Sequence, residues 1–468
     1  MKKEKEIFQA ITEVSDELVE EAEKPMGNEK GRSTGASWYQ RHKRFVAAAA
    51  CVVLAVGLVA AGVHGFGGRQ KAGSGNPLVK VEQPVRAFAA DDYPALNEYL
   101  AQNTVSDEFY EAMAQFSWKT ASELLTDGSE NRNYSPVSLY YALAMAAAGA
   151  GGETQEELLS LLGMSDVEEL IEQCGNYYRR KYRDDEISKL TLANSIWLDD
   201  NVTWKKDYPE RMAQELYAEV YWTDLALPDA GKQMGAWVAK NTGDLLQPTF
   251  GTDPETILNI LNTIYFEDEW LDRFNAKRTA ADEFYTADGE TVTCDFMNST
   301  QLGSFYRGDG FLMAGRNLKK TGSMIFVLPE EGVSVQELLA SPEKLKEAFT
   351  AQRDIYGEIV WQIPKFDFST KLDVKDALQE LGVNRAFEMD ADFSGITDDV
   401  AFLSGVRQES CISIDEIGVS AAAFTQIDYA GAAPPEDTAY MILDRPFLYA
   451  IMTKDSPLFI GVCENPAR

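Results

Sequence analysis

Hydrophobic and polar positions follow different patterns in different parts of the chain. Apolar residues recur at helical spacing from Ile7 to Leu18, which predicts a short amphipathic helix. Residues 45–63, "FVAAAACVVLAVGLVAAGV", carry no charge and are long enough to cross a bilayer as a helix. Further on, "SMIFVL" at 323–328 predicts a buried strand, and "TKLDVKDALQELGV" at 370–383 predicts an amphipathic helix. Interleaved strands and helices of this kind predict a mixed α+β domain.

The apolar run at 45–63 predicts a membrane anchor. The preceding "RHKR" favours a cytoplasmic N-terminus, because positive charge next to a span stays on the cytoplasmic side. A cleaved signal peptide is the alternative and would release a secreted protein, although 44 residues before the run exceed a usual n-region. We therefore expect a single-pass cell-membrane protein with four parts: a cytoplasmic segment at 1–44, a transmembrane anchor at 45–66, a linker at 67–104 and an extracytoplasmic domain at 105–468.

Charge narrows the classes of partner. The formal net charge is -32, and residues 1–44 are balanced, so the whole excess lies in the rest of the chain. A surface this acidic repels phosphate backbones. We expect no nucleic-acid partner.

Histidine is scarce, which restricts catalysis. His42 and His64 are the only two histidines, and both precede the expected domain. A Ser-His-Asp or Cys-His hydrolase, and the common zinc sites, need an imidazole there. The scarcity of histidine does not exclude enzymes that use a lysine or a carboxylate as the base, but the sequence shows no group of residues that would form such a site.

Metal sites are not indicated either. The five cysteines include no CxxC pair, and "DADFSGITDDVA" from Asp390 resembles a calcium loop whose closing position is Ala401 in place of a bidentate glutamate. We expect no metal, no other cofactor and no enzyme activity.

Several longer motifs occur in a fixed order. "NRNYSPVSLYYALAMAAAGAGGET" at 131–154 opens with Ser-Pro helix-start chemistry and continues as a wholly apolar helix. "TLANSIWL" at 191–198, "LNTIYFEDEW" at 261–270 and "SPLFIGVCENP" at 456–466 follow. In these motifs the chain resembles the serpins, a family of serine-protease inhibitors. The resemblance implies a monomer with three β-sheets, a belt of helices and an exposed reactive-centre loop.

The resemblance also implies a hinge and a reactive bond in "DEIGVSAAAFTQIDYAGAAPPEDT", residues 415–438. Small residues alternate with apolar ones there, and no proline interrupts 418–433, as a strand that must enter a sheet requires. After a protease cuts the loop, insertion of fifteen residues would carry the protease roughly 50 Å. The hinge positions are Glu416, Gly418, Val419, Ser420, Ala421, Ala422 and Ala423.

The reactive bond implied by the family pattern is Ala432–Ala433, or Gly431–Ala432 when the downstream prolines are aligned. Both alternatives offer a small residue to the protease. A shallow primary pocket accepts such residues, so elastase-like or subtilisin-like serine proteases are the expected targets.

Residues that support sheet opening are nominated by position. Ser135, Ser138 and Asn262 would lie under the opening sheet, and Trp270 and Lys365 where the hinge enters, with Lys365 as an ion-pair partner of Glu416. Two positions depart from the family: Gln408 replaces a histidine, and Gly235 replaces an asparagine. Together with Phe424, Gln408 supports the alternative of a non-inhibitory serpin-like binding or structural module whose loop is only a substrate.

Overall fold

The computed structural model describes residues 48–60, 77, 79, 81–84, 92–126, 130–251, 253–417, 437–453 and 456–467. The predicted N-terminal helix lies outside the described residues. So do the hinge from Gly418 to Ala423 and the reactive-bond candidates Gly431, Ala432 and Ala433.

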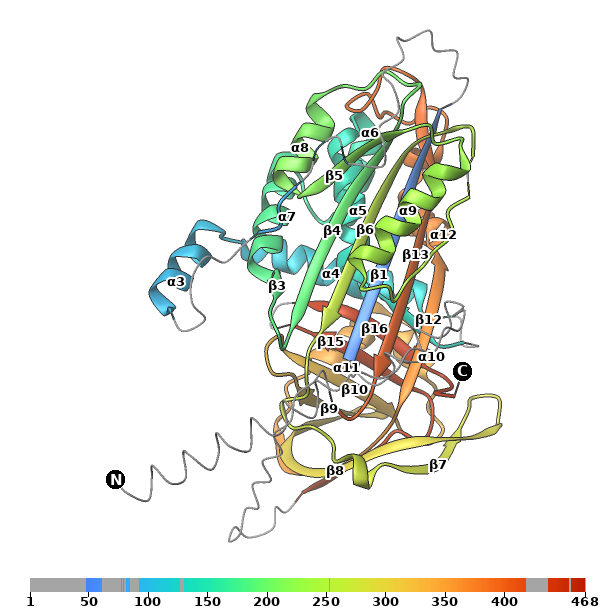
Figure 1. Cartoon of the computed structure of the whole chain (residues 1–468). Helices are drawn as coiled ribbons and strands as arrows, with labels where there is room; N and C mark the ends of the chain where they lie inside the picture. Colours follow the sequence, from blue (N-terminus) through green and yellow to red (C-terminus); the bar gives the residue numbers. More distant parts are fainter. Residues whose placement is uncertain are drawn as a thin grey trace, which may run out of the picture. The chain divides into compact units, whose positions relative to one another are not determined.

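Within the described residues, seven strands form a long central sheet in the order β12-β13-β1-β6-β4-β3, with β5 pairing β4 (Figure 1). Its strands are β1 (Ala48–Ala60), β3 (Arg183–Asp184), β4 (Lys189–Asp199), β5 (Ala218–Thr223), β6 (Thr256–Glu267), β12 (Phe366–Asp373) and β13 (Ala401–Ile414).

The other nine strands of the described chain are hydrogen-bonded in one continuous series, which we divide at the long strand β8 into two sheets. The first part of β8 pairs with β7 and β11, and its last residues pair with β9. Three sheets are therefore present, as expected. The strands are β2 (Arg132–Tyr134), β7 (Ala280–Tyr285), β8 (Thr291–Gly308), β9 (Phe311–Asn317), β10 (Ser323–Pro329), β11 (Ile355–Pro364), β14 (Thr438–Ile442), β15 (Phe447–Met452) and β16 (Pro457–Cys463).

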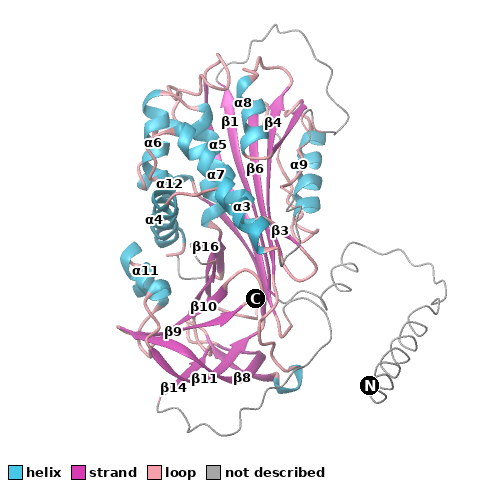
Figure 2. Ribbon diagram, turned by 90° about the vertical axis from the view of Figure 1, so that its left-hand side faces the viewer, coloured by secondary structure: helices cyan, strands magenta, loops and turns pink. Residues whose placement is uncertain are grey.

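Helices cover both faces of the central sheet, with α9 on one face and α5 and α7 on the other (Figure 2). The helices are α3 (Tyr93–Gln102), α4 (Asp107–Leu124), α5 (Pro136–Gly149), α6 (Gly152–Leu162), α7 (Val167–Lys181), α8 (Asp207–Glu215), α9 (Pro228–Asn241), α10 (Val335–Leu339), α11 (Pro342–Thr350) and α12 (Lys375–Glu380), with short 3-10 turns η1 (Ala276–Arg278) and η2 (Arg385–Phe387).

Helix α5 is the predicted buried helix, and its sequence explains its place. Ser135 caps its N-terminus through an oxygen that accepts from the Ser138 amide, and Pro136 occupies the first turn. Nearly every residue of α5 is buried, because the helix carries no charge on any side.

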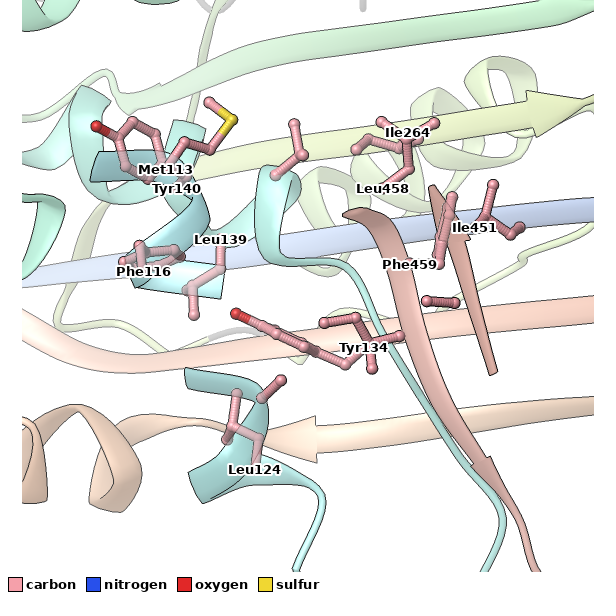
Figure 3. Packing of buried hydrophobic residues seen from close by; sticks show 14 of the residues in the cluster. Met113, Phe116, Leu124, Tyr134, Leu139, Tyr140, Ile264, Ile451, Leu458 and Phe459 are labelled. Atoms are coloured by element: carbon pink, nitrogen blue, oxygen red, sulfur yellow. The ribbon is translucent and has the colours of Figure 1, made fainter. Parts of the chain in front are cut away.

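The main core lies where α4 and α5 meet the sheets (Figure 3). Phe116 and Tyr140 pack edge to face with ring centroids 5.1 Å apart. The buried hydroxyl of Tyr134 donates to Thr120 Oγ1 at 2.7 Å, and that of Tyr140 to Leu162 O at 2.9 Å. Because these hydroxyls are paired, the aromatic rings can be buried without leaving unsatisfied donors.

The predicted helix at 370–383 is only half right. Residues up to Asp373 belong to β12, where buried and exposed positions alternate, and the helix α12 starts at Lys375. Residues 370–373 fit both patterns, and the period-two alternation of 366–373 describes their structure better than the helical spacing does.

The predicted membrane helix at 45–63 is described differently by the structure. Residues 48–60 form strand β1, which lies between β6 and β13 in the central sheet (Figure 1). In the part of the chain that is described, no helix has the length and apolar character needed to cross a bilayer. The run is rich in valine, leucine and alanine, and a charge-free run of this kind suits a central strand with both faces covered as well as a bilayer helix.

Candidate functional site

The base of the predicted hinge is fixed to the structure by backbone contacts. Strand β13 ends at Ile414, and Asp415, Glu416 and Ile417 follow as the last described residues before the loop. Trp270, fully buried, donates its Nε1–H to Asp415 O at 2.9 Å. The Phe274 amide donates to Glu416 O at 3.0 Å. The chain is thus held firmly up to the residue where the loop begins.

The side chain of Glu416 accepts two hydrogen bonds. Lys365 Nζ donates to its Oε2 at 2.9 Å, which is the expected ion pair, and Thr279 Oγ1 donates to its Oε1 at 2.7 Å. Burial by itself would raise the pKa of Glu416, but these two donors outweigh it and hold the pKa below its ordinary value. Glu416 therefore stays ionised where the chain leaves the sheet.

Its neighbour Asp415 is in the opposite electrostatic situation. Burial raises the pKa of Asp415 to about 6, and the negative charge of Glu416 adds to the effect. The amide of Ile417 donates to Asp415 Oδ1 at 2.8 Å and limits the rise.

A buried arginine, which the sequence analysis did not identify, lies beneath the hinge. The Arg316 guanidinium carbon is 4.0 Å from the centroid of the Phe274 ring and within 6 Å of those of Trp270 and Trp361. It donates to Ser299 Oγ at 2.9 Å and to Asp272 O at 2.6 Å. Burial lowers the pKa of Arg316 to about 9. The sequence feature that could have identified Arg316 is that it is a single arginine within the mostly apolar strand β9.

Polar residues also meet in the middle of the central sheet. Ser138 on α5 donates its hydroxyl to Asn262 Oδ1 on β6, and Asn262 Nδ2 donates to Asn194 Oδ1 on β4 at 2.7 Å. Asn194 Nδ2 in turn donates a hydrogen bond to Leu216 O at 2.7 Å. Sequence reasoning nominated Ser138 and Asn262 but missed Asn194, although a polar residue inside the buried run "TLANSIWL" marks it.

Gln408 joins Ser135 through both ends of its amide. The Ser135 backbone amide donates to Gln408 Oε1 at 2.9 Å, and Gln408 Nε2 donates to Ser135 O at 3.1 Å. Ser410 lies two residues further along β13 and donates to Asn133 O at 2.6 Å. The glutamine that replaces the family's histidine therefore ties β13 to the start of α5 without a group that titrates near neutral pH.

The second departure, Gly235, also has a steric reason. A Cβ at this position of α9 would lie 2.7 Å from Pro248 O. A side chain there would require a backbone shift, so glycine suits this close approach.

The position open to an inserted loop follows from the sheet order. A chain that leaves β13 at Ile414 and turns back can pair only with an edge of β13. One edge of β13 pairs with β12 and the other with β1, and β6 lies on the far side of β1. This second position, between β13 and β6, is here called the central slot, and β1 occupies it, with Leu54 opposite both Gln408 and Asn262.

The nominated residues thus gather at two places. Trp270, Lys365 and Glu416 surround the base of the hinge, while Ser135, Ser138, Asn262 and Gln408 lie beside the central slot at its middle.

Comparison with known proteins agrees with this arrangement. The family model described as Serpin (serine protease inhibitor) matches residues 111–466. Serpin-Z2A of Triticum aestivum is 29% identical over 382 residues, covering 76% of this chain and 95% of that protein. Alpha-1-antiproteinase S of Cavia porcellus is 28% identical over 377 residues, covering 78% and 92%. The crystal structure of the thermophilic serpin tengpin in its native state is 27% identical with a TM-score of 0.68, covering 77% of this chain and 95% of that one. By its sequence and by its three-sheet fold, the chain belongs to the serpin family.

Proposed function

We propose that this serpin is a suicide-type inhibitor of serine proteases with a small primary pocket, such as elastase-like or subtilisin-like enzymes. The observation that carries the proposal is the central slot: the sheet accepts a strand between β6 and β13, antiparallel to both, directly beside the anchored base of the hinge. A cut loop needs a place of this geometry to become a central strand.

The proposed mechanism begins as ordinary proteolysis. The protease serine attacks the carbonyl of Ala432, or of Gly431, and the next residue leaves as a free amine, which produces an acyl-enzyme. The loop N-terminal to the cut then enters the central slot and carries the protease roughly 50 Å along the sheet. Distortion of the protease active site leaves the ester bond unhydrolysed.

We further propose that the inhibitor acts outside the cytoplasm at the cell membrane, held by residues 45–63, or as a secreted protein if that segment is cleaved. The charge-free length of the segment and the basic residues before it support this location.

A gel assay with elastase tests the inhibitory mechanism. Because β1 fills the central slot, the assay uses both the full chain and a full-chain Val53→Pro variant, since a proline in the middle of β1 removes a ladder donor and weakens its pairing. A complex that resists SDS is expected with at least one of the two. Clean loop cleavage without a complex in both would overturn the proposal.

A specificity variant gives a matched control. Ala432→Arg offers a basic residue to the protease, so this variant, in the same two backgrounds, is expected to trap trypsin while losing its complex with elastase.

A second candidate function is a non-inhibitory binding or structural module. The occupation of the central slot by β1 favours it, because a filled slot leaves no room for the loop. Heating after loop cleavage discriminates in the Val53→Pro variant, whose slot is open: loop insertion raises the unfolding temperature strongly, whereas cleavage of a loop that stays outside does not.

A further inference from the structure

We propose that the N-terminal strand β1 is an intramolecular plug of the central slot, and that its presence there excludes insertion of the reactive loop. The inference rests on the proposed inhibitory function and adds regulation to it: when residues 48–60 fill the slot, the cleaved loop is excluded and the protease is not trapped.

The pairing of β1 covers the slot from end to end. On one side, Ala48 lies opposite Ile414 and Ala60 opposite Ala401, which is the full span of β13. On the other side, Ala49 pairs with Glu267 and Val59 with Thr256, the two ends of β6. The ladder groups of both neighbours are therefore used along their lengths, and a second strand has no edge to pair with.

The direction of β1 is the one that an inserted loop would take. β1 starts beside Ile414, at the base of the hinge, and runs antiparallel to β13 toward Ala401. A loop that turns back after Glu416 would start at the same end and run the same way. Plug and loop thus compete for one place in one orientation.

The composition of β1 fits this place. Its sequence, "AAACVVLAVGLVA", has no charge and no proline, as a central strand covered on both faces requires. Two buried polar residues beside the slot, Asn262 and Gln408, do not need a polar partner from β1, because Asn262 bonds Ser138 and Asn194, and Gln408 bonds Ser135. By contrast, the loop strand would bring Gln426 and Asp428 into the sheet.

The same segment is the proposed membrane anchor, and it cannot be in both places at once. Residues 48–60 either pair in the slot or leave it, for instance for a bilayer. Departure of β1 opens the place that the cleaved loop needs. The plug is therefore a switch between a blocked and a competent inhibitor.

The residence of β1 in the slot can be tested without any substitution. Cys51 of β1 lies directly opposite Cys411 of β13, and opposed residues in antiparallel strands have Cβ atoms roughly 4.5–5.5 Å apart. A short bifunctional thiol reagent, applied to the folded full chain and followed by peptide mapping, is expected to join Cys51 to Cys411.

Two variants control the cross-linking. Cys51→Ser removes the link. In that background, Ser369→Cys places a thiol opposite Cys411 on the other neighbour, β12, and must be joined to it under the same conditions. A link in this control, together with no Cys51–Cys411 link in the unmodified chain, would overturn the plug.

The exclusion itself is tested by the yield of SDS-stable elastase complex. Val53→Pro, in the middle of β1, is expected to raise the yield at least about tenfold over the unmodified chain, while Val63→Pro, in the same apolar run but beyond β1, leaves it unchanged. Equal, high yields in all three chains would show that β1 does not block the loop, while the inhibitory function would stand. Cleavage without complex in all three would reject inhibition, and the exclusion with it.

Discussion

At the scale of single residues, the base of the hinge depends on the Lys365–Glu416 pair. The Glu416 side chain is only 11% exposed, so Lys365→Met would leave a nearly buried carboxylate with Thr279 as its remaining side-chain donor. We expect the variant to lose about 1–2 kcal/mol of unfolding free energy, because one buried charged partner is left without its counterpart. Urea unfolding monitored by circular dichroism measures the change.

A second lysine, on strand β12, supplies the matched control. Lys371 Nζ lies 3.2 Å from Glu409 Oε1, but the lysine side chain is 75% exposed. Lys371→Met should change the unfolding free energy by no more than about 0.5 kcal/mol. Equal losses in the two variants would show that burial of Glu416 does not matter.

The adjacent carboxyl group of Asp415 predicts a pH dependence of opposite sign to that of an ordinary ion pair. Its pKa is about 6 in the folded chain, against about 3.9 when unfolded. The folded state therefore holds this proton more tightly, so its contribution to stability is present at low pH and is lost as pH rises from about 4 through 6. The stabilisation that Glu416 contributes through its lowered pKa is fully present above its unfolded pKa of about 4.3 and is lost only as the pH falls below that value.

Asp415→Asn isolates this effect, since the amide oxygen can still accept from Ile417. Between pH 4.5 and 6.5 the unmodified chain is expected to lose on the order of 2 kcal/mol relative to the variant. Urea midpoints at several pH values give the difference. Parallel pH profiles for the two proteins would contradict the burial of Asp415 as its cause.

At the scale of elements, the buried chain of hydrogen bonds from α5 to β4 carries a further prediction. Ser138→Ala removes the donor to Asn262 Oδ1 and leaves a buried acceptor without its partner. A loss of about 1–3 kcal/mol is expected in the unfolding free energy. In Ser117→Ala on α4, the lost hydroxyl donates only to Met113 O, a helix carbonyl, so the change should stay near zero.

The elements differ in how far the sequence could predict them. Helix α5 was predictable because Ser135, Pro136 and a charge-free run specify both its start and its burial. The ion pair of Glu416 and the contact of Trp270 with the hinge followed from the family resemblance. Asn194 and Arg316 were marked only as polar residues inside apolar strands; their partners, and the contact of Thr279 with Glu416, were not predictable, because they form only after distant strands come together.

Strand β1 could not be predicted from the hydrophobic pattern of its sequence. An apolar run with no charge has no period that separates a bilayer helix from a doubly covered strand. Only the sheet itself supplies the missing information, because residues 48–60 pair with β13 on one side and with β6 on the other, with one register shift on each side.

At the scale of the whole molecule, the free energy released by loop insertion depends on what the central slot holds beforehand. Each ladder hydrogen bond contributes about 1 kcal/mol net, so a strand inserted into an empty slot contributes on the order of 10 kcal/mol. When β1 is already paired there, insertion exchanges one strand for another and the net gain is small. Pairing of β1 in the slot would thus already have released most of the free energy that loop insertion needs in order to trap the protease.

This exchange predicts different responses to cleavage. We expect uncleaved Val53→Pro to unfold at a lower temperature than the unmodified chain, because its slot is poorly filled. Loop cleavage should then raise its unfolding temperature by on the order of 20 °C, but raise that of the unmodified chain by only a few degrees. Scanning calorimetry before and after limited elastase digestion measures both. The same large rise in the unmodified chain would show that the cleaved loop displaces β1 freely. No rise in either protein would show that the cleaved loop does not enter the sheet, because insertion requires the central slot.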